Sequence, residues 1–236
     1  NRQMNRTLEE TAGAMYRSWF VDFDPVVAKA AGRAPAHLSP ALAALFPAAF
    51  QDSDLGPIPK GWRIGKLDEV LVLQRGFDLP AGSRTAGPYP IIAASGLNGT
   101  HHEFKVKGPG VTTGRSGVLG KVYYVEEDFW PLNTSLWIKE YPLGSPLHAY
   151  HLLQGMEIET YNAGSAVPTL NRNHVHNLPV VIPPPALVEA FEAQARPLFQ
   201  MRHHNQAESQ TLAALRDTLL PKLLSGEVRV KLELSL

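Results

Sequence analysis

Cysteine is absent from the 236-residue sequence. Its absence excludes disulfide bonds and thiolate metal sites, and it suits a reducing cytosol. Long hydrophobic runs are also absent, because no apolar stretch approaches the roughly 18 residues that span a bilayer. No basic, apolar and small-residue leader opens the chain, which starts inside a helical pattern. We therefore expect a cytoplasmic protein, and we interpret the start as that of a fragment or of a processed or shortened form.

An excess of charge of either sign is missing too, since 22 basic residues balance 22 acidic ones. A neutral chain argues against a protein that coats DNA by electrostatics alone. The charge is nevertheless uneven, because between Arg75 and Lys121 six cations face only two anions, Asp78 and Glu103. A concentrated basic patch on a neutral protein is compatible with a specific DNA site. The alternative is an ordinary fluctuation of surface charge.

Motifs of nucleotide-using and hydrolytic enzymes are missing as well. There is no G-x-x-x-x-G-K-[ST] phosphate loop, and Gly114-Arg115-Ser116-Gly117 is not a G-x-S-x-G nucleophile elbow. The asparagine–proline–proline–aromatic tetrapeptide of adenine methyltransferases does not occur. The histidines include no H-E-x-x-H pattern, so we predict no metal site and no catalytic residue. We expect solvated histidines, with DNA contact as the alternative for His101 and His102.

The chain is organised as a helix, a connector, a β-rich middle and a second long helix. Short apolar runs punctuated by Gly, Pro and Asn predict strands between about residues 60 and 182, and the Ala- and Pro-rich connector has room for one short helix near 39–46. The predicted fold class is therefore α+β. The predicted segments are a coiled-coil helix at 1–24, a linker at 25–58, a β-rich domain at 59–183, a second coiled-coil helix at 184–226 and a tail at 227–236.

Both helices carry apolar residues at alternating steps of three and four, which is the pattern of a coiled coil. At one constant offset, Leu8 matches Leu212 and Met15 matches Leu219, so the first helix resembles part of the second. We predict that the last helix packs on the first, within the chain or from a second copy, through Leu8, Thr11 and Met15 on one side and Leu212, Leu215 and Leu219 on the other. Chance similarity of two amphipathic helices is the alternative.

Two polar loops are candidates for contacts with DNA. The glycine-rich segment 111–121 offers backbone amides and the side chains of Arg115, Ser116 and Lys121 to a phosphate, although a tight hairpin would explain its glycines equally well. In the second loop, Asn171 is suited to adenine and Arg172 to guanine in the major groove. A turn with an asparagine cap is the alternative there.

Several segments, read in order, resemble one family. They are LEETAGAMYRSWFVDF (8–23), LGPIPKGW (55–62), GRSGVLG (114–120), WPLNTSL (130–136), GSAVPTLN (164–171), VIPPP (181–185) and LLPKLLSGEV (219–228). Together they resemble the specificity subunits of type I restriction–modification systems. The resemblance implies two β-rich target-recognition domains, each reading one half of a split DNA site. It also implies that an antiparallel coiled coil of two long helices joins the domains, sets their spacing and binds methyltransferase subunits.

For this chain, the resemblance implies a single recognition domain flanked by the coiled-coil helices. It looks like the second half of a full subunit or a half-length version that forms a homodimer. The implied partners are double-stranded DNA, methyltransferase subunits and restriction subunits, and S-adenosylmethionine, ATP and magnesium are expected only in those partner subunits. Nine residues are predicted to contact DNA: Arg75, Arg84, His101, His102, Arg115, Ser116, Lys121, Asn171 and Arg172.

Two functions of other classes remain open from the residues alone. One is a fragment of a stand-alone methyltransferase or nuclease, against which the missing catalytic motifs speak. The other is a coiled-coil adaptor that does not bind DNA, against which the basic stretch between Arg75 and Lys121 speaks. Binding of S-adenosylmethionine by the isolated chain would favour the enzyme, and indifference to DNA would favour the adaptor.

Overall fold

The computed structural model describes residues 1–162 and 166–228. The chain divides into two compact units. One unit combines residues 1–12 with the chain from residue 197 onward, and the other runs from Gly13 to Arg196. No helix within the described ranges is long and apolar enough to cross a membrane.

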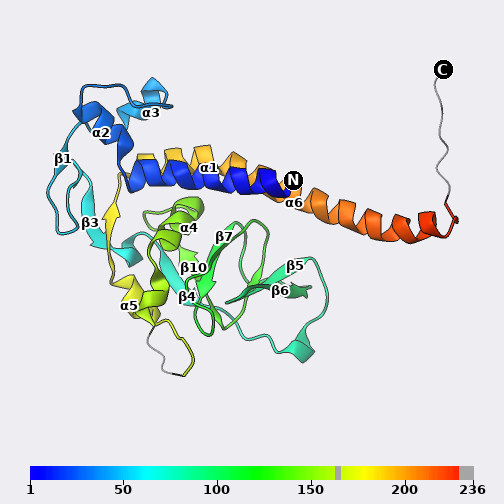
Figure 1. Ribbon diagram of the computed structural model, residues 1–236. Helices are drawn as coiled ribbons and strands as arrows, with labels where there is room; N and C mark the ends of the chain where they lie inside the picture. The colour runs from blue at the N-terminus through cyan, green and yellow to red at the C-terminus, as the bar shows by residue number, and fades with distance from the viewer. Residues whose placement is uncertain (163–165, 229–236) are drawn as a thin grey trace, which may run out of the picture. The chain divides into compact units, whose positions relative to one another are not determined.

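The first unit is made of the two long helices. α1 (Arg2–Phe20) starts in it, and α6 (Pro185–Leu224) enters it at Pro197. The side-chain amide of Asn205 donates to Asn5 Oδ1 at 3.0 Å, and Arg202 Nη1 lies 2.7 Å from Glu9 Oε2. As the residue number rises in α1 it falls in α6, so the helices are antiparallel (Figure 1).

This register corrects the predicted packing of the two helices. Asn5 lies opposite Asn205 and Glu9 opposite Arg202, so Leu8 lies level with the turn around Arg202. Leu212 is about three turns farther along α6 and its side chain is 54% exposed. Packing of Leu212 on Leu8 within one chain is therefore wrong, whereas packing between copies stays a prediction.

The second unit contains most of the β-structure, in two main sheets. The larger sheet has the order β4-β10-β7-β8, and all neighbouring strands in it are antiparallel. Its strands are β4 (Val72–Arg75), β7 (Gly110–Gly114), β8 (Val122–Val125) and β10 (Ser135–Glu140). The smaller sheet has the order β6-β5-β9 and contains β5 (Tyr89–Ala93), β6 (Gly96–His101) and β9 (Trp130–Pro131).

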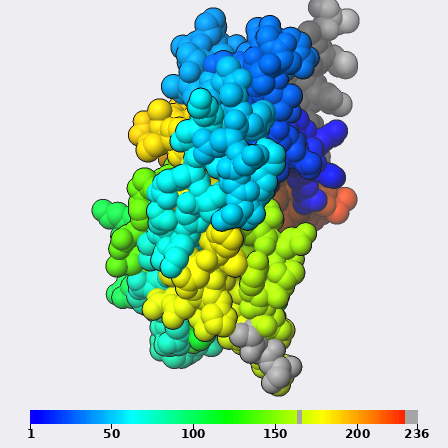
Figure 2. Space-filling model, turned by 90° about the vertical axis from the view of Figure 1, so that its left-hand side faces the viewer, coloured from blue at the N-terminus to red at the C-terminus, as the bar shows by residue number. Residues whose placement is uncertain are grey.

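Two short pairs complete the strands of this unit. They are β1 (Phe50–Gln51) with β2 (Ile58–Pro59), and β3 (Arg63–Lys66) with β11 (Pro179–Ile182). The second pair brings the start of the β-rich region beside its end, because Arg63 lies opposite Ile182. In Figure 2 the cyan residues of β3 lie next to the yellow segment that contains α5 (Arg172–His176) and β11. This pair of strands thus joins the two ends of the β-rich region.

The connector itself contains short helices, and further short helices lie between the strands along the chain. The connector holds two helices, α2 (Asp24–Ala30) and α3 (Pro40–Ala44), where one was predicted. The additional helix starts at Asp24, and Pro25 lies in its first turn, where the fixed φ of proline suits a helix. The remaining elements are α4 (Pro146–Gly155) and the 3-10 turns η1 (Leu67–Glu69), η2 (Ala81–Ser83) and η3 (Ile158–Tyr161).

An aromatic cluster anchors the first part of α6 to the rest of the second unit. Phe191 is fully buried, and its ring centroid lies 5.5 Å from that of Phe20 and 5.6 Å from that of Tyr16. Glu192 is the next residue, and its carboxylate accepts a hydrogen bond from the Leu147 backbone N–H at 2.9 Å. Because that amide belongs to the first turn of α4, Glu192 caps this helix from α6.

Candidate nucleic-acid interface

Several cations lie at one end of the four-stranded sheet, where strands from different parts of the sequence begin or end. Arg75 ends β4 and lies opposite Leu136 near the start of β10, while Gly114 ends β7 opposite Ser135. Thr113 lies opposite Val122, which begins β8. The antiparallel order therefore brings Arg75, Arg115 and Lys121 to the same edge. We call this edge the strand-end surface, and it comprises Arg75, Asp78, Arg115, Ser116, Lys121 and Asn133.

The side chains of the strand-end surface hold one another in place. Arg75 Nη2 donates to the two carboxylate oxygens of Asp78 at 3.2 and 3.3 Å, and the side-chain amide of Asn133 donates to the same carboxylate. Arg115 Nη1 donates to the Asn133 carbonyl oxygen at 3.2 Å. Asp78 and Asn133 were not among the predicted contacts, because 55 residues separate the two partners in the chain.

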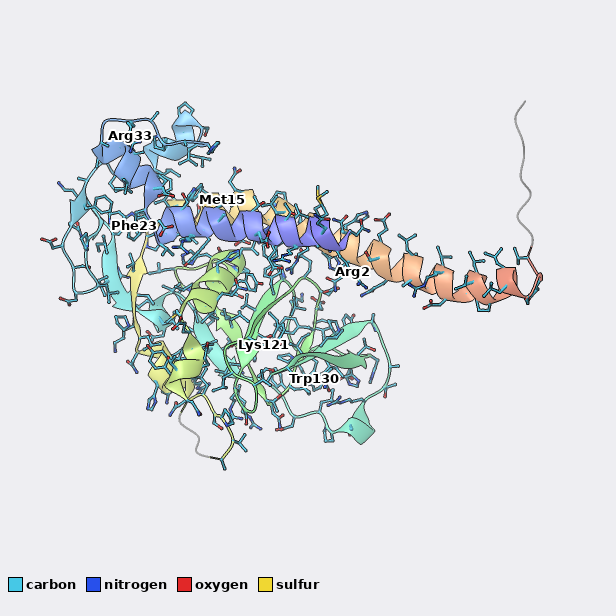
Figure 3. All side chains as sticks on the ribbon, in the orientation of Figure 1. Arg2, Met15, Phe23, Arg33, Lys121 and Trp130 are labelled. Atoms are coloured by element: carbon cyan, nitrogen blue, oxygen red, sulfur yellow. The ribbon has the colours of Figure 1, made fainter. Side chains whose placement is uncertain are left out.

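The glycine-rich segment is the loop of the β7–β8 hairpin. A β-carbon on Gly114 would overlap the Val118 carbonyl oxygen, so the close approach of the loop to the end of β7 requires glycine there. The backbone N–H groups of Arg115 and Ser116 both donate to the Thr134 carbonyl oxygen, at 2.8 and 3.0 Å. The expectation that these two amides hold a phosphate is therefore wrong. Phosphate contacts by the side chains of Arg115 and Lys121 stay a prediction (Figure 3 labels Lys121).

The second predicted loop adjoins the strand-end surface. The Leu170 N–H donates to the Arg115 carbonyl oxygen at 2.8 Å, which brings the start of α5 beside the hairpin loop. Asn171 Oδ1 accepts from the Asn173 N–H at 3.0 Å and caps α5, as in the alternative that the sequence left open. Arg172, the first residue of α5, is exposed. Contacts of Asn171 and Arg172 with DNA stay predictions.

The remaining predicted contacts lie on and beside β6. His102 is exposed, whereas His101 is only 3% exposed, so its predicted place on an exposed loop is wrong. His101 Nδ1 lies 3.1 Å from the Thr85 carbonyl oxygen, and its ring centroid lies 5.2 Å from that of Trp130, labelled in Figure 3. His101 therefore fixes the loop before β5. Arg84, which precedes Thr85, donates a hydrogen bond to Asn98 on β6.

Comparison with known proteins identifies the family. The model of the type I restriction modification DNA specificity domain matches residues 59–189, which is more than half of the chain. The chain belongs to this family. The match starts at residue 59, where the predicted recognition domain starts. It ends at Glu189 inside α6, two residues before the buried Phe191.

Two curated relatives extend the likeness over the whole chain. The MjaIX specificity subunit of Methanocaldococcus jannaschii is 24% identical over 98% of this chain and 55% of its own length. The HindI specificity subunit of Haemophilus influenzae is 24% identical over 97% of this chain and 63% of its own length. The chain thus spans little more than half the length of the curated relatives it matches.

A solved structure supports the fold of the specificity domain. The crystal structure of a type I restriction–modification S subunit from M. genitalium is 20% identical, with a TM-score of 0.56 over 70% of this chain and 46% of that one. The predicted α+β class, with a β-rich domain and long antiparallel helices, is confirmed.

The sequence predicted that the histidines outside the candidate interface are solvated, and for two of them this prediction is wrong. His148 and His151 on α4 are buried, and the ring of His148 lies 5.0 Å from that of Phe20. Burial, and to a smaller extent the charge of His151 beside it, lowers the pKa of His148 to about 3. Within residues 1–162 and 166–228, no cluster of three or more histidine, cysteine or carboxylate side chains could hold a metal ion.

Proposed function

We propose that this chain is the DNA-recognising part of a type I restriction–modification specificity subunit, acting in the cytosol and reading one half of a split target. The observation that carries the proposal is the convergence of Arg75, Arg115 and Lys121 on one edge of the specificity domain. Cations collected from three strands suit a phosphate backbone, which supplies affinity and fixes register.

Recognition in this proposal is differential binding of DNA and includes no chemical step. Arg115 and Lys121 hold phosphates, while polar side chains on the same domain contact base edges and discriminate between sequences. Methyl transfer from S-adenosylmethionine and cleavage that needs ATP and magnesium belong to methyltransferase and restriction subunits. The names of both curated relatives, which are specificity subunits, support this division of labour.

The second part of the proposal concerns the far half of α6. Leu212, Leu215 and Leu219 are 54%, 50% and 43% exposed and recur at steps of three and four. A row of exposed leucines at this spacing suits another helix. We propose that it pairs with the equivalent helix of a second recognition half, in the same longer chain or in a second copy, and that methyltransferase subunits dock on this coiled coil.

A selection experiment tests DNA recognition directly. The purified chain is incubated with a library of randomised double-stranded DNA, and bound duplexes are sequenced at two salt concentrations. We expect an enriched motif, with affinity that falls as salt rises because binding releases counterions. Absence of any enriched motif would contradict the proposal. Binding of S-adenosylmethionine by the chain alone would instead favour a methyltransferase fragment.

A further inference from the structure

The β6 strand carries an irregularity on an exposed edge. Pro90 on β5 lies opposite Thr100 and Ile92 lies opposite Leu97, so one residue separates the pairs on β5 and two residues, Asn98 and Gly99, separate them on β6. This extra residue is a β-bulge, which re-aims the side chains of its strand. Gly99 supplies the positive φ of +95° that the bulge requires.

The bulge presents its side chains to solvent. Leu97 is 68% exposed, more than any other large apolar side chain described between Gly13 and Arg196. Asn98, Gly99 and Thr100 are exposed as well. In the β6-β5-β9 sheet β6 is at the edge, visible in Figure 1 beside β5, so the β5–β6 hairpin makes up the two outer strands of the sheet. The major groove of B-DNA is wide enough for a two-stranded β-ribbon.

The orientation of the Asn98 amide is fixed by Arg84. Arg84 Nη1 donates to Asn98 Oδ1 at 2.7 Å and lies 3.3 Å from the Asn98 carbonyl oxygen. Arg84 Nε reaches the Leu79 carbonyl oxygen at 3.4 Å, which leaves Nη2. Since a guanidinium can only donate, the oxygen of the amide faces Arg84 and the amide nitrogen is its other end.

Two donors remain on this pair of hydrogen-bonded side chains. Within the described residues, neither Arg84 Nη2 nor Asn98 Nδ2 makes a hydrogen bond. The Oδ1 of Asn98 is already occupied, and Arg84 has no acceptor. In the major groove, guanine presents two acceptors, N7 and O6, whereas adenine pairs one acceptor with a donor and cytosine presents a donor. Two donors on one hydrogen-bonded pair of side chains therefore match guanine better than any other base.

We infer that Arg84 and Asn98 together read a guanine of the target, with Asn98 held in its reading orientation by Arg84. The inference rests on the proposed DNA recognition and names the base that one element of it selects. It also separates two roles within the domain. The bulge of β6 discriminates between bases, and the cations of the strand-end surface hold the backbone without regard to sequence.

The test uses Asn98→Asp, which replaces the donating amide nitrogen with an acceptor and keeps an oxygen for Arg84. Wild-type chain and variant are each passed through the selection from randomised duplexes. We expect a guanine at one position of the wild-type motif to lose its preference by about fivefold to 100-fold, with cytosine favoured there because its amine donates. The rest of the motif should be unchanged. Asn177→Asp, the same change at an exposed asparagine outside both surfaces, should leave the whole motif intact.

A second variant guards against misfolding of the first. Arg84→Lys keeps the charge and one donor for Asn98 but loses Nη2, so it should weaken the same guanine. Thermal melting of each variant establishes that it is folded. An unchanged motif in both folded variants would overturn the inference and leave the proposed function standing, and so would an equal loss of affinity for all duplexes. A wild-type chain without any motif would overturn both.

Discussion

The two halves of α6 differ in what stabilises them, although they belong to one continuous helix. The first half buries Leu187, Val188, Phe191 and Ala195, whereas the last half exposes Leu212, Leu215 and Leu219. Burial of apolar surface is the main source of helix stability in proteins. The first half is therefore part of the folded specificity domain and its neighbours, and the last half leaves exposed the apolar row that we propose a partner covers. The comparison predicts that equivalent changes in the two halves have different consequences.

The largest effect is expected in the first half. Phe191→Ala removes a ring that contacts Tyr16, Trp19 and Phe20, so it should lower the free energy of unfolding by about 3–5 kcal/mol. Chemical denaturation of the isolated chain measures this change. Phe191→Leu, which keeps most of the apolar volume, is the matched control and should cost less. An Ala variant as stable as wild type would show that the first half is not anchored as described.

Acid should act on the same buried cluster. The pKa of His148 is lowered to about 3 from an ordinary value of 6.5, so the unfolded chain binds a proton at pH values where the native one does not. Stability should therefore be fully present above pH 6.5 and fall as the pH drops toward 3, with about 2 kcal/mol lost by pH 5. Denaturation midpoints measured between pH 7 and pH 5 check this. In His148→Gln the loss over this interval should be much smaller.

The exposed half should behave in the opposite way. Leu212→Ala in the isolated chain should change the free energy of unfolding by no more than about 0.5 kcal/mol, because this side chain is 54% exposed. The same variant should lower the recovery of complexes with methyltransferase subunits, measured by co-purification. A strongly destabilised chain would show that Leu212 is packed within it, and unchanged recovery would remove the proposed pairing.

The smallest effect on stability is expected at the strand-end surface, whose side chains we propose to serve DNA binding. Arg115→Ala or Lys121→Ala should weaken all duplexes about equally and reduce the slope of log affinity against log salt by roughly one unit. Titrations at several salt concentrations measure that slope. Lys139→Ala, an exposed lysine at the other end of β10, is the control and should leave the slope unchanged. A changed preference at a single base would assign Arg115 or Lys121 to base reading instead.

Local patterns predicted some of the strands and both long helices. Two short apolar runs between Gly, Pro and Asn, at 89–92 and 122–125, fall within β5 and β8, and the long last helix was predicted within a residue of its start at Pro185. These elements were predictable because alternation and heptad spacing are local properties. The buried row of α1 was not, since the predicted positions Thr11 and Met15 each lie one residue away from a buried one, Ala12 and Tyr16. Large aromatic side chains decide which face is buried.

The candidate site was predictable only in part. Charge counting found Arg75, Arg115 and Lys121, and the strand order then explains why they converge. The hydrogen bonds that join Asn133 to Asp78 and Arg84 to Asn98 were not predicted, because contacts between distant segments leave no pattern in the sequence. His101 was misplaced for a related reason. A histidine next to another in a polar stretch looks exposed, yet the ring packs beneath Thr85 and against Trp130.

The cap that Glu192 provides for α4 has a consequence for domain exchange. A chimera that transplants residues 59–183 onto the helices of a relative would carry Leu147 but leave Glu192 behind. The first turn of α4 would then lose its acceptor unless the recipient helix offered a carboxylate at the same level. Arg196, which lies within hydrogen-bonding distance of Glu192, would be lost with it. A segment exchanged between relatives should therefore extend to Arg196. A graft that ends at the three prolines 183–185 would separate α4 from the residue that caps it.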